Sequence, residues 1–401
     1  MPSIDEQLAT LRRGTSEIIS EADLAEKLKS GKPLRVKLGV DPTVGSVTLG
    51  WAVVLRKLRD FQKLGHTAVL IIGDFTAMIG DPSGKSKTRP QLTRQQVEEN
   101  VTEVSKQIYK ILDPDLTEIR YNKDWLGPMT FEDVIRLTSR YTVARILERD
   151  DFTKRLKEER PVAMHEILYP LCQGYDSVAV ESDVELGGND QKFNNLVGRN
   201  LMAQYGMQPQ VVILSPLLIG TDGKEKMSQS LGNYVGISEA PNDMYGKTMS
   251  IPDELMENWF ELCTDVPLDE VKTLVASAKS GDVNPRDIKR RLAKEIVALY
   301  HGPQAPQEAD DYFIQTFSQR MQPVDAEEAP IPAEALQDGH VNLPAAITVL
   351  GFAKSNGQAK DLIKAGAVSL DGEKVSELRL PEAEVRGKVL KVGKHHFRRL
   401  I

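Results

Sequence analysis

Residues 34–75 read LRVKLGVDPTVGSVTLGWAVVLRKLRDFQKLGHTAVLIIGDF and decide the fold class of this chain. The run 34–40 is typical of a β-strand, residues 50–65 have the periodicity of a helix that stops at a glycine, and residues 67–75 form a second apolar strand. A strand, a short loop, a helix and another strand in this order indicate a βαβ unit. The segment therefore predicts an α/β domain built on a parallel sheet.

Two loops follow these predicted strands, at residues 41–49 and 74–88. Ligands of parallel sheets bind beyond the carboxyl ends of the strands, so we expect both loops to open onto that edge. The second loop contains IGDPSGKSKT, which differs from a phosphate-binding P-loop because three residues, rather than four, separate Gly80 from Gly84. We expect a tight loop at the sheet edge instead, with Asp81 directed inward.

The composition is that of an ordinary globular protein. The 401 residues are 40% hydrophobic and 27% charged, which is enough for two or three domains with a large core. The chain has no run of 18 apolar residues and its N-terminus lacks the apolar core of a signal peptide, so we expect a cytoplasmic protein without a membrane segment. Two cysteines and six scattered histidines lack metal-ligand spacing, so we expect no metal except ions carried by a substrate.

The rest of the chain changes character along its length. Residues 92–160 alternate amphipathic helices with polar turns, residues 211–220 form another buried strand, and residues 253–301 have the pattern of helices. Residues 302–340 are rich in Pro, Glu, Asp and Ala, which is typical of a hinge, and contain one predicted helix at 308–320.

The end of the chain has the pattern of a small separate module. It predicts two short helices, a glycine turn and a β-hairpin around Asp371-Gly372. Residues 341–401 carry 11 Lys+Arg and 6 Asp+Glu, a net charge of +5, so the remainder of the chain sums to −12. A basic module on an acidic body can bind a polyanion, and a solvated tail of mixed charge is an equal alternative.

One candidate binding segment is YPLCQGYD (169–176), at the end of a predicted amphipathic helix. Tyr169, Gln173 and Asp176 are spaced four and three residues apart, so they share one helix face. Two hydrogen-bonding side chains and a carboxylate on one face suit a small ligand with an amine and a hydroxyl group. A polar network buried between helices would have the same pattern.

Two further segments are candidates for nucleotide contacts. GGNDQ (187–191) places two glycines, which allow close backbone approach, before Asp190 and Gln191, although a turn before a helix has the same composition. DGKEKMSQSLGN (222–233) is bounded by glycines and carries Lys226, which could close over a polyphosphate; a solvated turn is the alternative.

Taken in order, these segments resemble bacterial tyrosyl-tRNA synthetases, which are class I enzymes, over nearly the full length of the chain. DPTVGSVTLGW corresponds to the family's DPT…HIGH segment, GGNDQ and YPLCQGYDSV to its tyrosine pocket, and KMSQS to its KMSKS loop. The resemblance implies a Rossmann-type catalytic domain at 1–235, a helical domain at 236–325, a linker at 326–340 and an S4-type α+β RNA-binding domain at 341–401.

The resemblance also implies an activity and its partners. The family converts L-tyrosine and ATP, which carries Mg²⁺, into tyrosyl-adenylate and pyrophosphate. It then transfers the tyrosyl group to the 3′ end of tRNA(Tyr), and it works as a homodimer. The residues implied to bind tyrosine are Lys37, Asp81, Tyr169, Gln173, Asp176 and Gln191. The residues implied to bind ATP are Pro42, Gly50, Trp51, Asp190, Lys226, Met227, Ser228 and Gln229. The catalytic positions are Thr43, Thr48, Lys226 and Gln229. The RNA-binding positions are Lys360, Lys364, Lys388, Lys391, Lys394, Arg398 and Arg399.

The sequence departs from the family at several of these positions. HIGH is replaced by Thr48-Leu49-Gly50-Trp51, so both histidines are absent, and Gln229 replaces the second lysine of KMSKS. Lys37 stands where many relatives have a tyrosine, and Asn189 is a mild change in GGTDQ. Losing one preorganised transition-state contact costs roughly 10²–10³ in rate. The sequence therefore predicts a tyrosine–tRNA ligase, or alternatively a catalytically impaired or repurposed paralogue that binds tyrosine or RNA without efficient adenylation.

Overall fold

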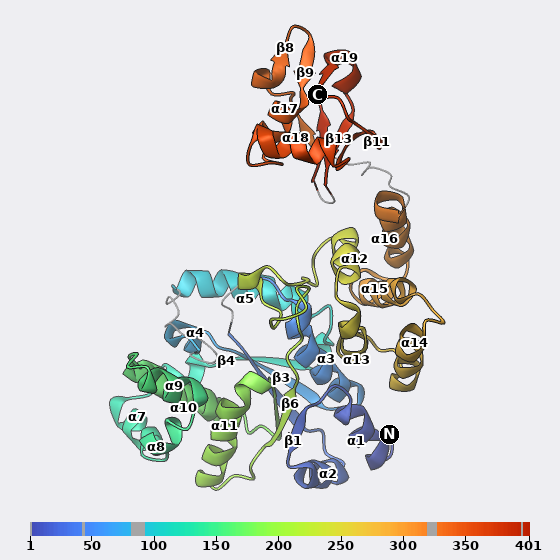
Figure 1. The fold of residues 1–401 in the computed structure, drawn as a ribbon. Coiled ribbons are helices and arrows are strands. Elements are labelled where there is room, and N and C mark those ends of the chain that lie inside the picture. The colour runs from blue at the N-terminus through green and yellow to red at the C-terminus, as the bar shows by residue number, and fades with distance from the viewer. Residues whose placement is uncertain (1, 42–44, 82–92, 319–326, 394–395) are drawn as a thin grey trace. The chain divides into compact units, whose positions relative to one another are not determined.

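The computed structural model describes residues 2–41, 45–81, 93–318, 327–393 and 396–401, and forms two compact units, 1–306 and 307–401. The first unit is built on a six-stranded sheet in the order β1-β6-β5-β2-β3-β4 (Figure 1). Its strands are β1 (Glu17–Ile19), β2 (Arg35–Val40), β3 (Thr67–Ile72), β4 (Thr117–Tyr121), β5 (Val184–Gly188) and β6 (Val211–Ser215). All neighbours are parallel except β1, which pairs antiparallel with β6 at one edge.

The βαβ unit predicted from residues 34–75 is confirmed. Helix α3 (Leu49–Lys63) connects β2 to β3, and the chain leaves the helix through Gly65, whose φ is +86°. Five of the six residues of β3 are buried, because both faces of a central parallel strand are covered. Helix α3 packs against β2, β3 and β5. The strand predicted at 211–220 is present as β6 but ends at Ser215.

The region 92–160 forms helices as predicted, with one exception. Residues 117–121 form β4, the last strand of the sheet, which the sequence pattern did not indicate. Every residue of β4 is only partly buried, as befits an edge strand, so its apolar signal is weak. The helices before and after β4 in the sequence are α4 (Thr76–Ile79), α5 (Arg94–Ile108), α6 (Lys123–Leu126), α7 (Phe131–Thr138), α8 (Val143–Ile146) and α9 (Asp150–Lys157).

Two long helices lie on the side of the sheet formed by β5 and β6. Helix α10 (Met164–Ala179) packs closely against α11 (Lys192–Gln204), which in turn contacts β5 and β6. Gly174 and Gly198 allow this approach, since a Cβ on Gly174 would lie 3.1 Å from the backbone nitrogen of Gly198. The helices α1 (Ile4–Arg12) and α2 (Glu21–Lys29) come before and after β1 in the sequence. None of the helices in the described part of the chain is both long and apolar enough to cross a bilayer.

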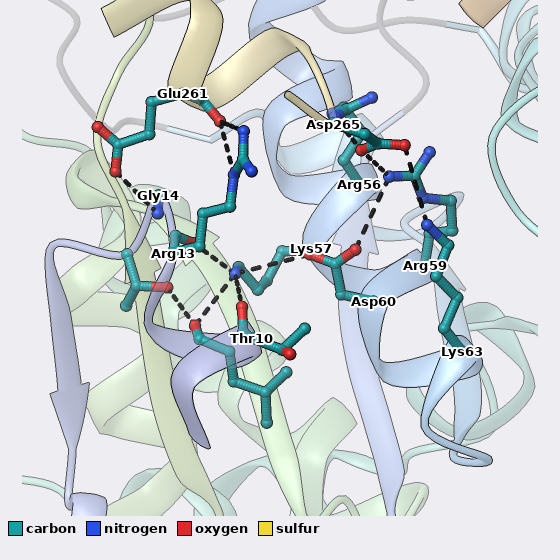
Figure 2. Close-up of polar contacts among 12 residues, drawn as sticks. Thr10, Arg13, Gly14, Arg56, Lys57, Arg59, Asp60, Lys63, Glu261 and Asp265 are labelled. Carbon is teal, nitrogen blue, oxygen red and sulfur yellow. Dashed lines mark hydrogen bonds and ion pairs between the residues drawn. The ribbon is translucent and has the colours of Figure 1, made fainter. Parts of the chain in front are cut away.

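Side chains of helix α3 form hydrogen bonds and ion pairs with residues from the beginning of the first unit's sequence and with Asp265, which comes much later in the chain (Figure 2). The ammonium of Lys57 donates to the carbonyl oxygens of Thr10, Leu11 and Arg13 at 3.3, 3.0 and 2.5 Å, so it caps the end of α1. Asp265 accepts from Arg56 and Arg59 of α3 at 2.6 and 2.7 Å. The helices predicted in 253–301 are present as α13 (Met256–Cys263), α14 (Leu268–Ser280) and α15 (Pro285–His301). Another helix, α12 (Pro241–Met249), comes before them.

The second unit has its own core and two small sheets. The larger sheet has the order β11-β10-β13-β14-β7 and the smaller has β12-β9-β8. The hairpin predicted around Asp371-Gly372 is confirmed, because Leu370 of β10 pairs with Glu373 of β11. The strands are β7 (Glu328–Ala329), β8 (Leu336–Gln337), β9 (His340–Asn342), β10 (Val368–Leu370), β11 (Glu373–Lys374), β12 (Arg379–Pro381), β13 (Val389–Val392) and β14 (His396–Leu400). The helices are α17 (Leu343–Val349), α18 (Asn356–Lys364) and α19 (Glu382–Val385).

The prediction that 326–340 is a linker needs correction. Strand β7 pairs with β14 and β8 pairs with β9, so residues 328–340 belong to the folded module. Ile331 and Ala335 are buried in the module's core, which explains why this proline-rich stretch is ordered. The helix predicted at 308–320 occurs as α16 (Ala305–Phe313), followed by a π-helical turn at Ile314–Ser318. The division of residues 1–325 at 235 stays a prediction.

Candidate active site at the carboxyl edge of the sheet

The sheet reverses its winding order between β2 and β5, and the candidate site lies at that point. From β2 the strand order runs outward through β3 and β4 on one side, and through β5 and β6 on the other. The loops after β2 and β5 therefore diverge and leave a crevice beyond the carboxyl ends of the strands, which is where open α/β sheets bind ligands. Asp41 follows β2, and Asp190 follows β5.

Helix α10 supplies the carboxylate at the bottom of the candidate pocket. Asp176 is buried and accepts hydrogen bonds from Trp125 Nε1 at 2.8 Å and from Asn122 Nδ2 at 3.4 Å. Burial raises the pKa of Asp176 to about 7, against the opposing effect of the Lys37 charge. A buried carboxyl group with two donors already aimed at it is suited to accept a third hydrogen bond from a ligand hydroxyl.

About two helical turns before Asp176, Tyr169 connects α10 to the loop after β2. Its hydroxyl donates to Asp41 Oδ2 at 2.7 Å, while Thr76 Oγ1 donates to Asp41 Oδ1 at 2.9 Å. Burial and then the Asp41 carboxylate raise the pKa of Tyr169 well above its ordinary value, so the phenol remains a donor. The Asp41 carboxylate can occupy this position because Gly73 has no side chain there: a Cβ on Gly73 would lie 1.9 Å from Asp41 Oδ1.

A chain of amide hydrogen bonds links the remaining predicted tyrosine-binding residues. Gln191 Nε2 donates to Asp81 Oδ2 at 2.9 Å. Asn194 Nδ2 donates to the side-chain oxygens of both Gln173 and Gln191 at 3.1 Å, and Arg149 Nη1 donates to Asn194 Oδ1 at 3.1 Å. The structure therefore brings together five of the six residues predicted to bind tyrosine: Asp81, Tyr169, Gln173, Asp176 and Gln191.

Lys37 is the exception among the predicted tyrosine-binding residues. Its side chain is fully buried, and its ammonium donates to Gln173 O, Ser177 Oγ and Glu185 Oε1 at 3.1, 2.8 and 2.9 Å. An ammonium has three hydrogens, and these three acceptors take all of them. The prediction of a direct contact between Lys37 and tyrosine is thus corrected: the side chain lies behind the residues that face the pocket.

The segments predicted to bind ATP meet at the start of α3. Thr48 caps this helix by accepting from Trp51 N at 3.4 Å, and Gly50 N donates to Met227 Sδ at 3.3 Å. Gln229, which occupies the position of the second lysine, donates its side-chain amide to Ser46 O at 2.9 Å. Trp51 is half-buried on the first turn of the helix.

The loop at 222–233 is held by its own hydrogen bonds and by one ion pair. Lys226 Nζ lies 2.9 Å from Asp190 Oδ2, so the loop reaches across to the end of β5. Asn233 accepts from Ser228 N at 2.8 Å and donates to Asp222 Oδ2 at 2.9 Å, which closes the loop internally. Pro42 and Thr43 lie outside the described residues, as do residues 82–88 of the loop that follows β3.

The residues predicted to bind RNA belong to the second unit. Lys360 and Lys364 are exposed one turn apart on α18, while Lys388, Lys391, Arg398 and Arg399 lie half-buried on or beside β13 and β14. Lys391 Nζ lies 5.2 Å from the centre of the Phe397 ring. Arg398 forms an ion pair with Glu327 at 2.9 Å. Lys394 lies outside the described residues.

Sequence patterns missed several residues that shape the site. Asn122 and Trp125 follow β4, so predicting that strand would have placed both at the same sheet edge as Asp41. Asn194 and Arg149 act through other side chains and carry no local signal. Asp41 itself stands in the DPT segment, where its spacing after β2 marks it as an edge residue.

The doubly wound sheet, the polar side chains at its switch point and the lysine-bearing loop are together typical of nucleotide-binding α/β proteins. Residues 29–318 match the model of the family described as tRNA synthetases class I (W and Y), and the chain belongs to that family. Within it, the chain is 52% identical over 401 residues to the tyrosine–tRNA ligase of Moorella thermoacetica, covering 98% of this chain and 95% of that protein. It is 48% identical over 396 residues to the tyrosine–tRNA ligase of Thermotoga maritima, covering 99% and 97%.

Solved structures agree on the fold. A tyrosyl-tRNA synthetase from Archaeoglobus fulgidus, complexed with L-tyrosine, superposes with a TM-score of 0.63 at 21% identity, over 77% of this chain and 99% of that one. A C-terminally truncated mitochondrial tyrosyl-tRNA synthetase from Aspergillus nidulans gives a TM-score of 0.65 at 20% identity, over 79% and 95%. The Rossmann-type fold predicted from the sequence is thus confirmed.

The approach of Gly73 to Asp41 generates a stability prediction. Gly73→Ala would place a methyl group 1.9 Å from Asp41 Oδ1 and 2.5 Å from Thr76 Oγ1, so it must displace both side chains. We expect it to lower the free energy of unfolding by roughly 1–3 kcal/mol, as overpacking does. Gly39→Ala, in β2 with open space around its Cβ position, is the matched control. Equal thermal midpoints for the two variants would contradict the proposed constraint.

Proposed function

We propose that this chain is a tyrosine–tRNA ligase. It would activate L-tyrosine with ATP to give tyrosyl-adenylate and pyrophosphate, then transfer the tyrosyl group to the 3′ end of tRNA(Tyr). The observation that carries the proposal is a cluster of bonded polar side chains at the sheet edge. Tyr169, Gln173 and Asp176 share α10, Gln173 and Gln191 both accept from Asn194, and Gln191 donates to Asp81. End-to-end similarity to proteins named tyrosine–tRNA ligases supports it.

The two ends of the pocket suit the two ends of tyrosine. Asp81, Tyr169, Gln173 and Gln191 offer oxygen acceptors for an ammonium group, and Asp176 offers an acceptor for the phenol hydroxyl. Phenylalanine would leave the buried Asp176 without its third hydrogen bond. A site built to bond a substrate hydroxyl rejects the analogue that lacks it by roughly 10⁴–10⁵-fold.

The chemistry needs positioning and charge stabilisation rather than a covalent nucleophile. In the proposed reaction Asp190 would bind the ribose, and Lys226 would move from Asp190 to the pyrophosphate. In the described part of the chain no three His, Cys, Asp or Glu residues are grouped to hold a metal ion, and we propose that Mg²⁺ enters bound to ATP. ATP and tRNA are both cytoplasmic, and we propose that the enzyme is too.

The altered ATP-site motifs keep structural roles. Thr48 caps α3, and Gln229 ties the loop to Ser46 O. Neither side chain carries the positive charge that the family's residue supplies to the transition state. Identity of 52% and 48% over 98% and 99% of this chain to proteins named tyrosine–tRNA ligases favours the ligase over the impaired paralogue, and adenylation can be measured directly.

The decisive experiment is tyrosine-dependent exchange of pyrophosphate into ATP. We expect exchange with tyrosine and none with phenylalanine or without an amino acid. The triple variant Thr48→His/Trp51→His/Gln229→Lys should exchange at least a hundredfold faster, because each restored contact is worth roughly 10²–10³ in rate. If the wild type binds tyrosine in calorimetry but shows no exchange, the chain is the non-adenylating paralogue.

We also propose a homodimer formed through the helices α7 to α10 of the first unit. Among the residues that the structure describes, the three most exposed large apolar side chains lie here: Phe131 is 80% exposed, Met164 72% and Val143 62%. Ile135, one turn after Phe131 on α7, is 53% exposed. Apolar exposure on this scale, on helices that lie together in Figure 1, is typical of a subunit interface. A second copy of this chain is the partner we propose.

The dimer proposal predicts that two charges on α7 separate the subunits. Phe131→Asp/Ile135→Asp should sediment as a monomer at micromolar concentration, where the wild type sediments as a dimer, because each buried aspartate would be desolvated without a partner. Val283→Asp/Val349→Asp changes two exposed valines elsewhere and should leave the dimer intact. A monomeric wild type would contradict the proposal.

We propose that the basic residues of the second unit bind the backbone phosphates of tRNA. Lys360 and Lys364 are both exposed on α18, so a polyanion can reach them. Lys360→Glu/Lys364→Glu should weaken tRNA(Tyr) binding and reduce the slope of log affinity against log salt by about two, one for each lost phosphate contact. Lys29→Glu/Lys32→Glu, an equal charge change in the first unit, is the control. An unchanged slope in the α18 variant would remove these lysines from the RNA-binding surface.

A further inference from the structure

A buried ion pair lies beneath the candidate tyrosine pocket. Lys37 and Glu185 are directly opposite each other in the pairing of β2 with β5, and their charged atoms are 2.9 Å apart. Their side chains are 0% and 1% exposed. A buried pair of this kind is often no more stabilising than two well-packed apolar residues, so stability alone does not account for its presence.

The pair is connected to helix α10 by both of its members. Lys37 donates to Gln173 O and to Ser177 Oγ, and Ser177 in turn donates to Glu185 Oε2 at 3.2 Å. Glu185 Oε2 also accepts from the side-chain amide of Gln210. Gly198 leaves room for this arrangement, because a Cβ there would lie 2.7 Å from Ser177 Oγ.

The two α10 residues that Lys37 contacts stand on either side of Asp176. Burial disfavours the charged form of Asp176, and the positive charge of Lys37 is the largest opposing influence. The hydrogen bonds from Trp125 and Asn122 act in the same direction as Lys37. The titratable groups around Asp176 are Lys37 on β2, Glu185 on β5, Tyr169 and Cys172 on α10, with Asp41 and Asp81 acting on Tyr169.

We propose that Lys37 is a positioning residue for tyrosine: its ammonium fastens α10 to β5 at Gln173 and Ser177, and its charge keeps the neighbouring Asp176 able to accept the phenol hydroxyl. Lys37 acts from behind the pocket and does not touch the substrate. This role rests on the proposed function, since it concerns the same tyrosine site.

The protonation state of Asp176 decides whether tyrosine affinity rises or falls with pH. The charged carboxylate accepts a strong hydrogen bond from the phenol, whereas protonation removes the charge and turns one oxygen into a donor, so the bond from the phenol weakens. Because the pKa of Asp176 is about 7, tyrosine affinity should rise as the pH increases through 7. Without the Lys37 charge the pKa of Asp176 rises further, so the same gain in tyrosine affinity should require a higher pH.

Trp125 provides a readout of Asp176 that needs no substrate. Its Nε1 donates to Asp176 Oδ1 at 2.8 Å, and the chain has three tryptophans. Labelling with 5-fluorotryptophan should give three fluorine signals, and Trp125→Phe identifies the relevant one. We expect this signal to titrate with a midpoint near pH 7 in the wild type.

The test variant is Lys37→Met/Glu185→Gln, which removes the charged pair without leaving one charge buried alone. We expect its midpoint to move upward by about one pH unit, the lower end of the effect of a neighbouring opposite charge. The dissociation constant for tyrosine in calorimetry should then rise about fivefold at pH 7 and stay nearly equal to that of the wild type at pH 8.5.

Arg155→Met/Glu166→Gln is the matched control. Arg155 of α9 and Glu166 in the first turn of α10 form another buried ion pair, 2.7 Å apart. This variant should lose stability without moving the Trp125 midpoint. An unmoved midpoint in the Lys37 variant would overturn the proposal. Absence of exchange in the wild type would instead overturn the proposed function, while the fluorine titration would still decide the role of Lys37.

Discussion

The pairing of β2 with β5 is the constraint on which the rest of the first unit depends. Val36 pairs with Val184 and Lys37 with Glu185, although these strands are far apart in the sequence. This pairing places the switch point of the sheet beside α10, so the loops after the two strands open on one crevice. The same register places Lys37 opposite Glu185 and so puts the buried charge beneath the pocket.

The candidate site also depends on the position of helix α3, whose start lies beside the crevice. Helix α3 presents Thr48, Gly50 and Trp51 at its first turn, while its later turns are tied to α1 through Lys57 and to the segment after α13 through Asp265. These bonds come from cationic side chains of α3 itself. These bonds hold the middle of α3 against α1 and the segment after α13, and we propose that the loop at 222–233 is the part that closes over the site.

The sequence predicted those parts of the structure that depend on local periodicity. The β2–α3–β3 unit, the hairpin at Asp371-Gly372 and the shared face of Tyr169, Gln173 and Asp176 all follow from spacing along the chain. Strand β4 was missed because an edge strand is covered on few sides and has a weak apolar pattern. The role of Lys37 was also out of reach, because its three acceptors come from two different elements that meet only in the folded chain. The order in 328–340 likewise depends on pairing with distant strands.

The two halves of the candidate site differ in how much sequence change the fold tolerates. In the tyrosine half, each side chain is buried or bonded to another site residue, so a substitution leaves a polar group without its partner and costs stability as well as binding. In the ATP half, the altered residues lie on a helix start and a loop. Thr48 still caps α3, and Gln229 still finds an acceptor in Ser46. The fold therefore accommodates these residues with their hydrogen bonds made, and we expect the changes to affect the catalytic rate rather than the stability.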